Sequence, residues 1–390
     1  MKNEIVLRLN RVQEKLRNHG LDGAIFVQKV DVFYLSATDQ TAHLWVPSEG
    51  PPLLMVRRSM ERARQDAAIQ DIVPLPGFSA LPNLIKENDG RLPRRIGLEM
   101  DVLPVNQYRV YKGLFPGSEM VDFSPVVRRI RMIKSPYEIS CMTRAAAMGD
   151  RMFNEVPSVL DFAETETDLA RHLESFYRGL GHPGIVRARA FNMECFYGHV
   201  LAGPSGAVPS ASPGPTGGPG LGPYYSQGAG RGKIRPHEPI LVDYTSSVEG
   251  YVSDQARLFS IGKLPRKFLY AHEVMIEVQE TIRENARPGI LAGELYEQAL
   301  KVVRRHELED GFMGYPDPVP FVAHGIGLEL DEWPIIGRNS KTVIEEGMVF
   351  ALEPKFVFPD EGVAGLESVF VVTAEGLRKL NHFPDAVFVC

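Results

Sequence analysis

Residues 238–262 read EPILVDYTSSVEGYVSDQARLFSIG, an apolar stretch that is interrupted by two aspartates. The pattern predicts two strands, one containing Asp243 and the other containing Asp254. An unpaired carboxylate among apolar neighbours is costly, so each aspartate needs a positive partner. This stretch therefore predicts a domain with sheets whose strands carry acidic residues.

Two later strand-like segments repeat the arrangement. Residues 347–358 (GMVFALEPKFVF) contain Glu353, and residues 364–373 (AGLESVFVVT) contain Glu367. Few lysines or arginines lie nearby in the sequence, so we expect either distant arginines or divalent cations to neutralise these carboxylates.

With His324, the four carboxylates form an oxygen-rich set of potential metal ligands. Such a set suits a pair of Mn²⁺, Co²⁺, Fe²⁺ or Zn²⁺ ions better than a thiolate site does. Two ions about 3.5–4 Å apart can share carboxylates and hold a water between them. Taken alone, each residue has an ordinary structural explanation. An aspartate at a strand end, for example, is usually a turn or cap residue.

The composition is that of a soluble globular protein and excludes disorder, a fibre and a coiled coil. The chain has 390 residues, 24% of them charged and 44% hydrophobic, with a formal net charge of -6. Without a basic block, this charge argues against nucleic-acid binding. Three cysteines without a CxxC pair favour a reducing cytoplasm. No apolar run approaches the ~18–20 residues of a membrane span, and no export signal is evident.

The hydrophobic pattern predicts two domains. Residues 1–124 alternate strands and helices and indicate an α/β domain, whereas residues 125–390 indicate an α+β domain. Ser135-Pro136-x-Glu138 is typical of a capped helix start just after the joint. Helical spacing or short apolar runs predict helices at 6–16, 166–180, 265–286 and 292–306, and strands at 23–28, 43–46, 52–56 and 95–100.

One stretch differs in composition. Residues 203–223 contain 7 Gly and 6 Pro, which excludes a helix or a central strand. Long loops of this kind are either functional or disordered. We leave two interpretations open, a flexible surface loop or the rim of an active site.

The local contexts of the five candidate ligands resemble those of the pita-bread metallopeptidase family, which includes aminopeptidase P, prolidase, methionine aminopeptidase and creatinase. The matching motifs are GYVSDQAR around Asp254, HGIGLELDEWP from His324, LEP at Glu353, and Glu367 followed by Val372-Thr373. Residues 8–38 and the segment VVRRIRMIKSPYEI (126–139) also resemble the creatinase-type N-terminal domain of the prolidase and aminopeptidase P branch. The resemblance covers nearly the whole chain.

This resemblance implies an α/β creatinase-type N-terminal domain (1–124) followed by an α+β pita-bread catalytic domain (125–390). It implies that Asp243 chelates one metal ion, that Asp254 and Glu367 bridge two ions, and that His324 and Glu353 hold the other. Mn²⁺ is the first choice, with Co²⁺, Zn²⁺ and Fe²⁺ as further possibilities. The implied activity is an Xaa-Pro aminopeptidase or Xaa-Pro dipeptidase that uses a metal-bridging hydroxide, with Glu353 accepting a proton. The implied assembly is a homodimer.

Four positions depart from the family pattern: Ser226 and Asp331 stand where histidines are usual, and Ile335 and Gly365 where arginines occur. The departures keep an alternative open, namely a C–N hydrolase or a lyase acting on a small zwitterion such as dimethylsulfoniopropionate, with Asp331 as the base. A binding module without activity is a third hypothesis.

The Gly/Pro stretch leads directly to Tyr224, Tyr225 and Ser226, which we predict to contact substrate. His182 and His199 are possible sources of an imidazole, but the sequence leaves their positions open. His237 has the ordinary reading of a loop histidine.

Overall fold

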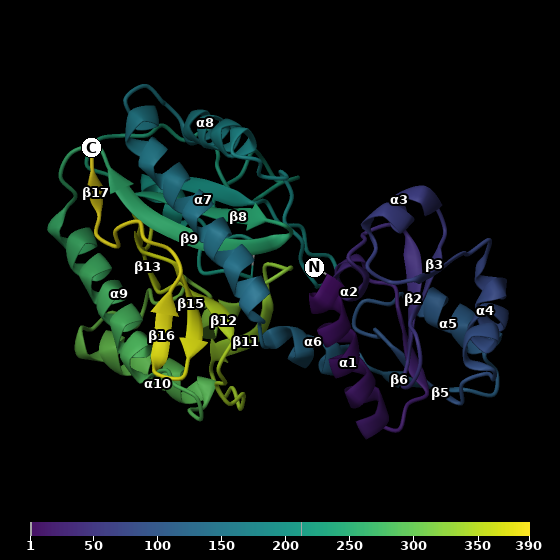
Figure 1. The fold of residues 1–390 in the computed structure, drawn as a ribbon. Helices are drawn as coiled ribbons and strands as arrows, with labels where there is room; N and C mark the ends of the chain where they lie inside the picture. The colour runs from purple at the N-terminus through teal and green to yellow at the C-terminus, as the bar shows by residue number, and fades with distance from the viewer. Residues whose placement is uncertain (1, 212) are drawn as a thin grey trace. The chain divides into compact units, whose positions relative to one another are not determined.

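The computed structural model describes residues 2–211 and 213–390 and divides into two compact units (Figure 1). Residues up to Arg131, together with Arg189–Asn192, form the N-terminal unit; Met132–Ala188 and Met193–Cys390 form the C-terminal unit. The predicted boundary at 124/125 falls at the first residue of helix α6 (Ser124–Met132), which ends the N-terminal unit. Among the described residues, no helix combines the length and the apolar character that crossing a membrane requires.

The N-terminal unit is built on a six-stranded mixed sheet in the order β4-β3-β2-β1-β5-β6. Helix α1 (Lys2–Asn18) buries Leu9, Val12 and Leu16 of the pattern that predicts it, whereas Val6 and Leu7 are exposed. The remaining elements are β1 (Gly23–Phe26), α2 (Lys29–Ser36), β2 (Ala42–Pro47), β3 (Leu53–Val56), α3 (Met60–Asp66), β4 (Asp71–Pro74), η1 (Phe78–Ala80), α4 (Leu81–Asp89), β5 (Arg95–Leu98), α5 (Val105–Leu114) and β6 (Glu119–Asp122).

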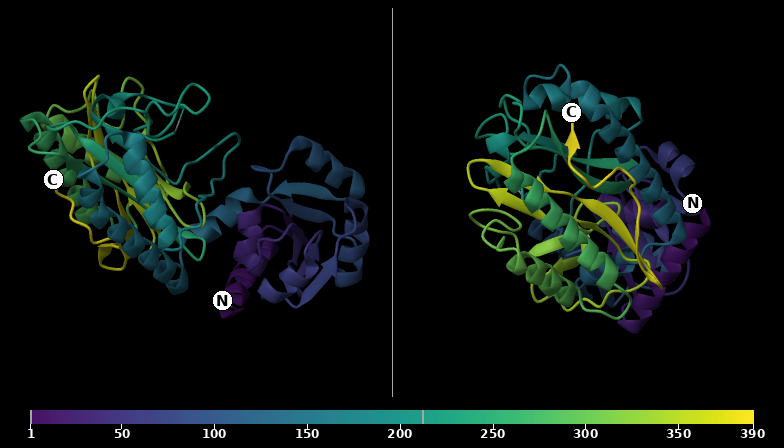
Figure 2. Two further views of the ribbon diagram at one scale, coloured as in Figure 1. Left: turned by 90° about the horizontal axis from the view of Figure 1, so that it is seen from above. Right: turned by 90° about the vertical axis from the view of Figure 1, so that its left-hand side faces the viewer.

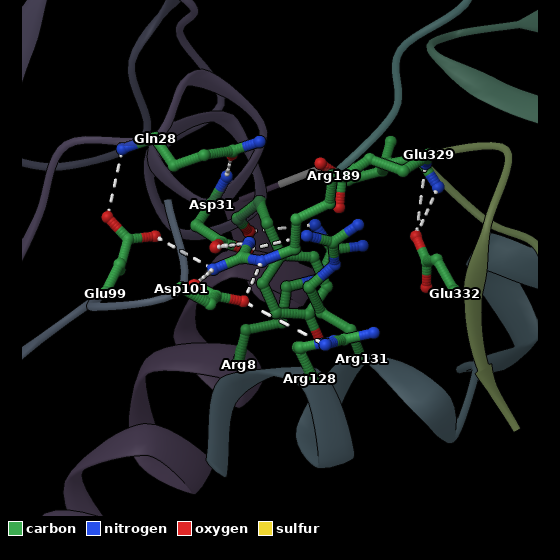
Figure 3. Close-up of polar contacts among 12 residues, drawn as sticks. Arg8, Gln28, Asp31, Glu99, Asp101, Arg128, Arg131, Arg189, Glu329 and Glu332 are labelled. Atoms are coloured by element: carbon green, nitrogen blue, oxygen red, sulfur yellow. Dashed lines mark hydrogen bonds and ion pairs between the residues drawn. The ribbon is translucent and has the colours of Figure 1, made fainter. Parts of the chain in front are cut away.

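Residues 189–192 belong to the N-terminal unit because Arg189 is buried in an acidic cluster of that unit (Figure 3). Its guanidinium pairs with Asp31 and lies 2.8 Å from an Asp101 oxygen, and Arg131 lies 2.7 Å from the other Asp31 oxygen. Burial alone would raise the pKa of Asp31, but the two arginines outweigh it and hold the pKa well below its usual range. The cluster thus fastens a segment far along the chain to the N-terminal sheet.

The C-terminal unit consists of two helix-covered sheets (Figures 1 and 2). The four-stranded sheet β17-β9-β8-β7 packs against α7 (Pro136–Leu160) and α8 (Glu166–Gly179), and the five-stranded sheet β11-β10-β12-β15-β16 packs against α9 (Arg266–Asn285) and α10 (Ala292–Arg305). The strands are β7 (Gly198–Ala202), β8 (Ile240–Val248), β9 (Tyr251–Ser260), β10 (Phe321–Gly325), β11 (Glu332–Gly337), β12 (Val349–Leu352), β13 (Lys355–Phe358), β14 (Gly362–Gly365), β15 (Ser368–Thr373), β16 (Gly376–Lys379) and β17 (Phe388–Val389). Strands β13 and β14 form a separate two-stranded ribbon.

The predicted capping box opens helix α7. The Ser135 hydroxyl accepts a hydrogen bond from the Glu138 backbone, and the Glu138 carboxylate accepts one from the Ser135 backbone. The Tyr251 hydroxyl on β9 donates to the other Glu138 oxygen at 3.0 Å. The cap therefore also joins the start of α7 to the sheet that carries Asp254.

Two predicted strands are each divided, which corrects the sequence prediction. Residues 347–358 form β12 and β13 with Glu353-Pro354 between them, because proline has no N–H group to continue a sheet ladder. Residues 364–373 include the end of β14 and the whole of β15, with Glu367 in the gap. Both glutamates therefore lie at breaks in their strands.

The Gly/Pro stretch begins as the short 3₁₀ turn η2 (Gly203–Ala207) and is otherwise irregular; Ser212 lies outside the described residues. Its middle part, residues 215–218, is buried, whereas residues 223–226 are exposed. One part of the stretch is therefore packed in the interior, and another part lies on the surface.

Candidate metal centre

The C-terminal sheets bring the five candidate ligands together. Antiparallel pairing of β8 and β9 sets Asp243 opposite Ala256 and Thr245 opposite Asp254. His324 lies on β10, which pairs with β12 just before Glu353. Glu367 exchanges backbone hydrogen bonds with Ala256 of β9, which joins the two sheets at this point. All five candidate side chains are buried.

Asp254, His324 and Glu367 form a site that suits one divalent ion. Each offers a ligand atom, and the three atoms lie within 4.8 Å of one another. Glu367 Oε1 is buried without a hydrogen-bond partner among the described residues, and it lies 3.7 Å from His324 Nε2. Since buried polar atoms are normally hydrogen-bonded, this oxygen is available to serve as a metal ligand. Two carboxylates and an imidazole are a common ligand set for a divalent transition metal.

The remaining carboxylates already have a cation. Lys355 Nζ donates to Asp243 Oδ2 at 3.0 Å, to Glu353 Oε2 at 2.9 Å and to Glu367 Oε2 at 2.9 Å. This finding corrects the expectation that divalent ions or distant arginines neutralise all the acidic residues, because Lys355 follows Glu353 by two positions. Asp254, His324 and Glu367 therefore form the metal-ligand group of this structure, and the predicted pair of ions stays a prediction.

Charge interactions dominate the titration of the cluster. Burial raises the pKa of Glu353 to about 7, partly offset by Lys355. For Glu367 burial acts in the same direction, but Lys355 and His324 outweigh it and lower the pKa to about 2. Burial, Glu367 and Asp243 together hold the pKa of Asp254 well above its usual range. A bound cation would favour the ionised form of Asp254.

Asp331 and Gly365, two departures from the family pattern, both contact this cluster. Asp331 Oδ1 lies 3.4 Å from His324 Nδ1, the ring nitrogen that faces away from Glu367. Gly365 lies directly opposite Lys355 in the β13–β14 pair. Ile335 lies opposite His324 on β11.

His199 is a residue whose place the sequence left open. Strand β7 pairs with β8 so that His199 lies opposite Asp243, with its Nε2 3.6 Å from Asp243 Oδ2 and 3.3 Å from Thr216 Oγ1. Burial lowers the pKa of His199, more than Asp243 raises it, so the ring is neutral at pH 7. Thr216 belongs to the buried middle of the Gly/Pro stretch, so this part of the stretch lies against the candidate centre.

The other polar candidates lie elsewhere. Tyr224, Tyr225 and Ser226 are exposed; the Tyr224 hydroxyl donates to the Leu221 carbonyl at 3.4 Å, and the Tyr225 ring packs against Phe196. His182 is buried against Tyr197, and His237 lies in a loop near the Lys263 carbonyl. The structure therefore brings His199, and not these residues, into contact with a candidate ligand.

Arg257 holds the backbone of Glu367 in place. Its guanidinium is buried, and Nη1 donates to the carbonyl oxygens of Glu367 at 2.5 Å and Ala256 at 2.8 Å. Nη2 pairs with Asp385 at 2.9 Å. The arginine of the GYVSDQAR motif is thus a positioning residue for a candidate ligand on another strand.

Comparisons with known proteins agree with this architecture. The model of metallopeptidase family M24 matches residues 140–374, and that of the creatinase/prolidase N-terminal domain matches residues 8–133. The Xaa-Pro dipeptidase of Pyrococcus furiosus is 22% identical over 96% of this chain and 97% of its own length. The Xaa-Pro dipeptidase of Lactobacillus helveticus is 29% identical over 73% of this chain and 70% of its own length.

Among solved structures, the X-Pro aminopeptidase of Thermotoga maritima matches with a TM-score of 0.81 at 21% identity, covering 98% of this chain and 99% of its own. An Xaa-Pro dipeptidase from Bacillus anthracis matches with a TM-score of 0.82 at 22% identity over 99% and 100%. These findings confirm the predicted fold, a creatinase-type N-terminal domain followed by a pita-bread catalytic domain, and do not favour the alternative of a C–N hydrolase or lyase. The chain belongs to metallopeptidase family M24.

Proposed function

We propose that this chain is a metal-dependent hydrolase that cleaves the bond before proline in Xaa-Pro dipeptides or in longer Xaa-Pro peptides. The observation that carries the proposal is the buried convergence of Asp254, His324 and Glu367, with one Glu367 oxygen that has no hydrogen-bond partner among the described residues. The proposal is supported by membership of family M24 and by relatives that are named Xaa-Pro dipeptidases.

A divalent ion held by Asp254, His324 and Glu367 would supply Lewis acidity toward a scissile carbonyl. Glu353 is the candidate general base, because its raised pKa of about 7 suits accepting a proton from water and returning it to the leaving proline nitrogen. His199, neutral and half-buried beside Asp243, can donate a hydrogen bond to a substrate carbonyl or accept a proton. Asp243 as a ligand stays a prediction; in this structure its Oδ2 accepts a hydrogen bond from Lys355.

The roles of four further residues stay predictions. Asp331 as a base is one; its contact with His324 Nδ1 also supports a positioning role, because a carboxylate on the outer nitrogen orients a ligand histidine. Tyr224, Tyr225 and Ser226 as substrate contacts are the others, and their exposure leaves them accessible to a peptide.

The decisive experiment measures proline released from Xaa-Pro dipeptides and amino acids released from Xaa-Pro-Yaa tripeptides. The protein is stripped with a chelator and then supplied with Mn²⁺, Co²⁺, Zn²⁺ or Fe²⁺ in turn. We expect activity only with metal, and a loss of about 10²–10⁴-fold for Glu353→Gln. The exposed Glu346→Gln is the matched control and should keep full activity. Absence of turnover on every Xaa-Pro substrate with all four ions would refute the proposal.

We also propose Mn²⁺ as the native ion, a homodimer and a cytoplasmic location. The oxygen-rich ligand set supports Mn²⁺, and the three free cysteines Cys141, Cys195 and Cys390 are compatible with a reducing compartment. Elemental analysis of protein purified without added metal, light scattering and cell fractionation test the three statements in turn.

A further inference from the structure

We propose that the centre of this chain holds a single divalent ion, at Asp254, His324 and Glu367 Oε1, and that the ammonium group of Lys355 permanently takes the place of a second ion. The inference deepens the proposed function and rests on its metal site. It concerns what the chain binds, so it is testable without any substrate.

The first support is that all the N–H donors of the Lys355 ammonium group are used in hydrogen bonds. An ammonium group has three N–H donors, and Lys355 directs all three to carboxylates of the cluster at 2.9–3.0 Å. The side chain is 1% exposed, so water does not compete for these bonds. A second ion would need the same three carboxylate oxygens and would be repelled by the ammonium charge at short range.

The second support is that the two carboxylate oxygens of Glu367 have different neighbours. Oε2 accepts a hydrogen bond from Lys355, while Oε1 is buried, has no hydrogen-bond partner among the described residues and lies 3.7 Å from His324 Nε2. Asp254 belongs to the three-ligand group with His324 and Glu367. Glu367 therefore bridges two different cations, a fixed ammonium and an exchangeable metal ion.

The third support is a backbone that makes room for the lysine. Gly365 lies opposite Lys355 with a φ of +148°, a conformation that favours glycine. A Cβ atom at Gly365 would lie 2.7 Å from Lys355 Cα, 3.0 Å from Lys355 Cγ and 2.4 Å from the Pro354 carbonyl oxygen. The absence of a side chain at Gly365 thus leaves room for the backbone and stem of Lys355 at this position.

Metal stoichiometry tests the inference directly. Full-length protein is stripped with a chelator, equilibrated with Mn²⁺ alone, and analysed by elemental analysis and electron paramagnetic resonance. We expect one Mn²⁺ per chain at saturation, with the spectrum of an isolated ion. Lys355→Ala should bind two ions per chain and give a spin-coupled spectrum. Lys134→Ala, which removes a buried lysine paired with Glu332 at 3.1 Å in the same unit, should remain at one ion.

Two coupled ions in the wild-type protein, or none, would overturn the inference, as would a folded Lys355→Ala variant that stays at one. If that variant does not fold by circular dichroism, the wild-type count still decides. Proline release separates the two proposals: one ion without Xaa-Pro turnover refutes only the proposed function, whereas two ions with turnover refute only the role of Lys355.

Discussion

Replacing Lys355 with methionine keeps a buried stem of similar length and removes the ammonium that Asp243, Glu353 and Glu367 share. Removing one partner of a buried ion pair costs about 3–5 kcal/mol, because a buried charge is left uncompensated. The carboxylates can limit this cost by taking up a proton. Glu353, whose pKa is already raised to about 7, can take up that proton at pH 7 at little further cost, so the loss lies toward the lower end of this range. We therefore expect metal-free Lys355→Met to lose about 3–4 kcal/mol of unfolding free energy at pH 7.

Urea unfolding in the presence of a chelator, followed by circular dichroism, measures this loss. The chain has two compact units, so two transitions are possible, and that of the N-terminal unit serves as an internal reference that should not move. The sign of the pH dependence is fixed by the carboxylates. Without Lys355 their pKa values rise in the folded state, so the deficit should shrink as the pH is lowered from 8 to 5. Added Mn²⁺ should also reduce it.

A deficit below about 1 kcal/mol at pH 7 would refute the reasoning, since it would mean that Lys355 does not compensate buried charge. A large deficit that is unchanged between pH 5 and pH 8 and insensitive to Mn²⁺ would also refute it. That result would assign the loss to packing alone. The matched variant Lys134→Met, which removes a buried lysine that contacts Glu332, should show no such response to Mn²⁺.

Three further predictions follow from named contacts. Gly365→Ala should cost about 2–3 kcal/mol in urea unfolding, because its φ of +148° and its contact with β13 both exclude a Cβ; Gly113→Ala, with open space around it, should be neutral or stabilising. Burial and Arg57 lower the pKa of His43 to about 4, so its contribution to stability is present above about pH 6.5 and is lost toward pH 4. The loss reaches about 3 kcal/mol by linkage, and His43→Gln should flatten that part of the pH–stability curve. His199→Gln should reduce proline release by about 10–10³-fold with an unchanged Mn²⁺ count, whereas unaltered turnover would remove His199 from the reaction.

Local signals in the sequence predict the elements around the centre well. The Ser135–Glu138 capping box opens α7 as expected, because its hydrogen bonds join residues three positions apart and need no tertiary context. The acidic strands are also local patterns, since Asp243 and Asp254 interrupt apolar runs. What such patterns cannot supply is the place where a strand breaks. The breaks at Glu353-Pro354 and at Glu367 depend on how the two sheets meet at the Ala256–Glu367 bridge.

Local sequence patterns do not predict contacts that depend on strand pairing, and His199 is an example. Its approach to Asp243 depends on the register of β7 against β8, and the long Gly/Pro stretch separates these strands in the sequence. Loop length leaves that register undetermined, because a shift of one residue would turn His199 to the opposite face of the sheet. Arg189 is a similar case, since its partner Asp31 is 158 positions away.

Lys355 is different, because its signal is in the sequence. Residues two apart in an extended segment point to the same side, so a lysine two positions after Glu353 is placed to accompany its carboxylate. Motif comparison points to the five ligand positions. It does not point to Lys355, which lies between Glu353 and Glu367 in the sequence and supplies a positive charge. A complete ligand set therefore does not fix the number of ions: three of its carboxylates can be satisfied by an ammonium group from the same ribbon. In this chain the identity of residue 355, together with the glycine opposite it, decides between one ion and two.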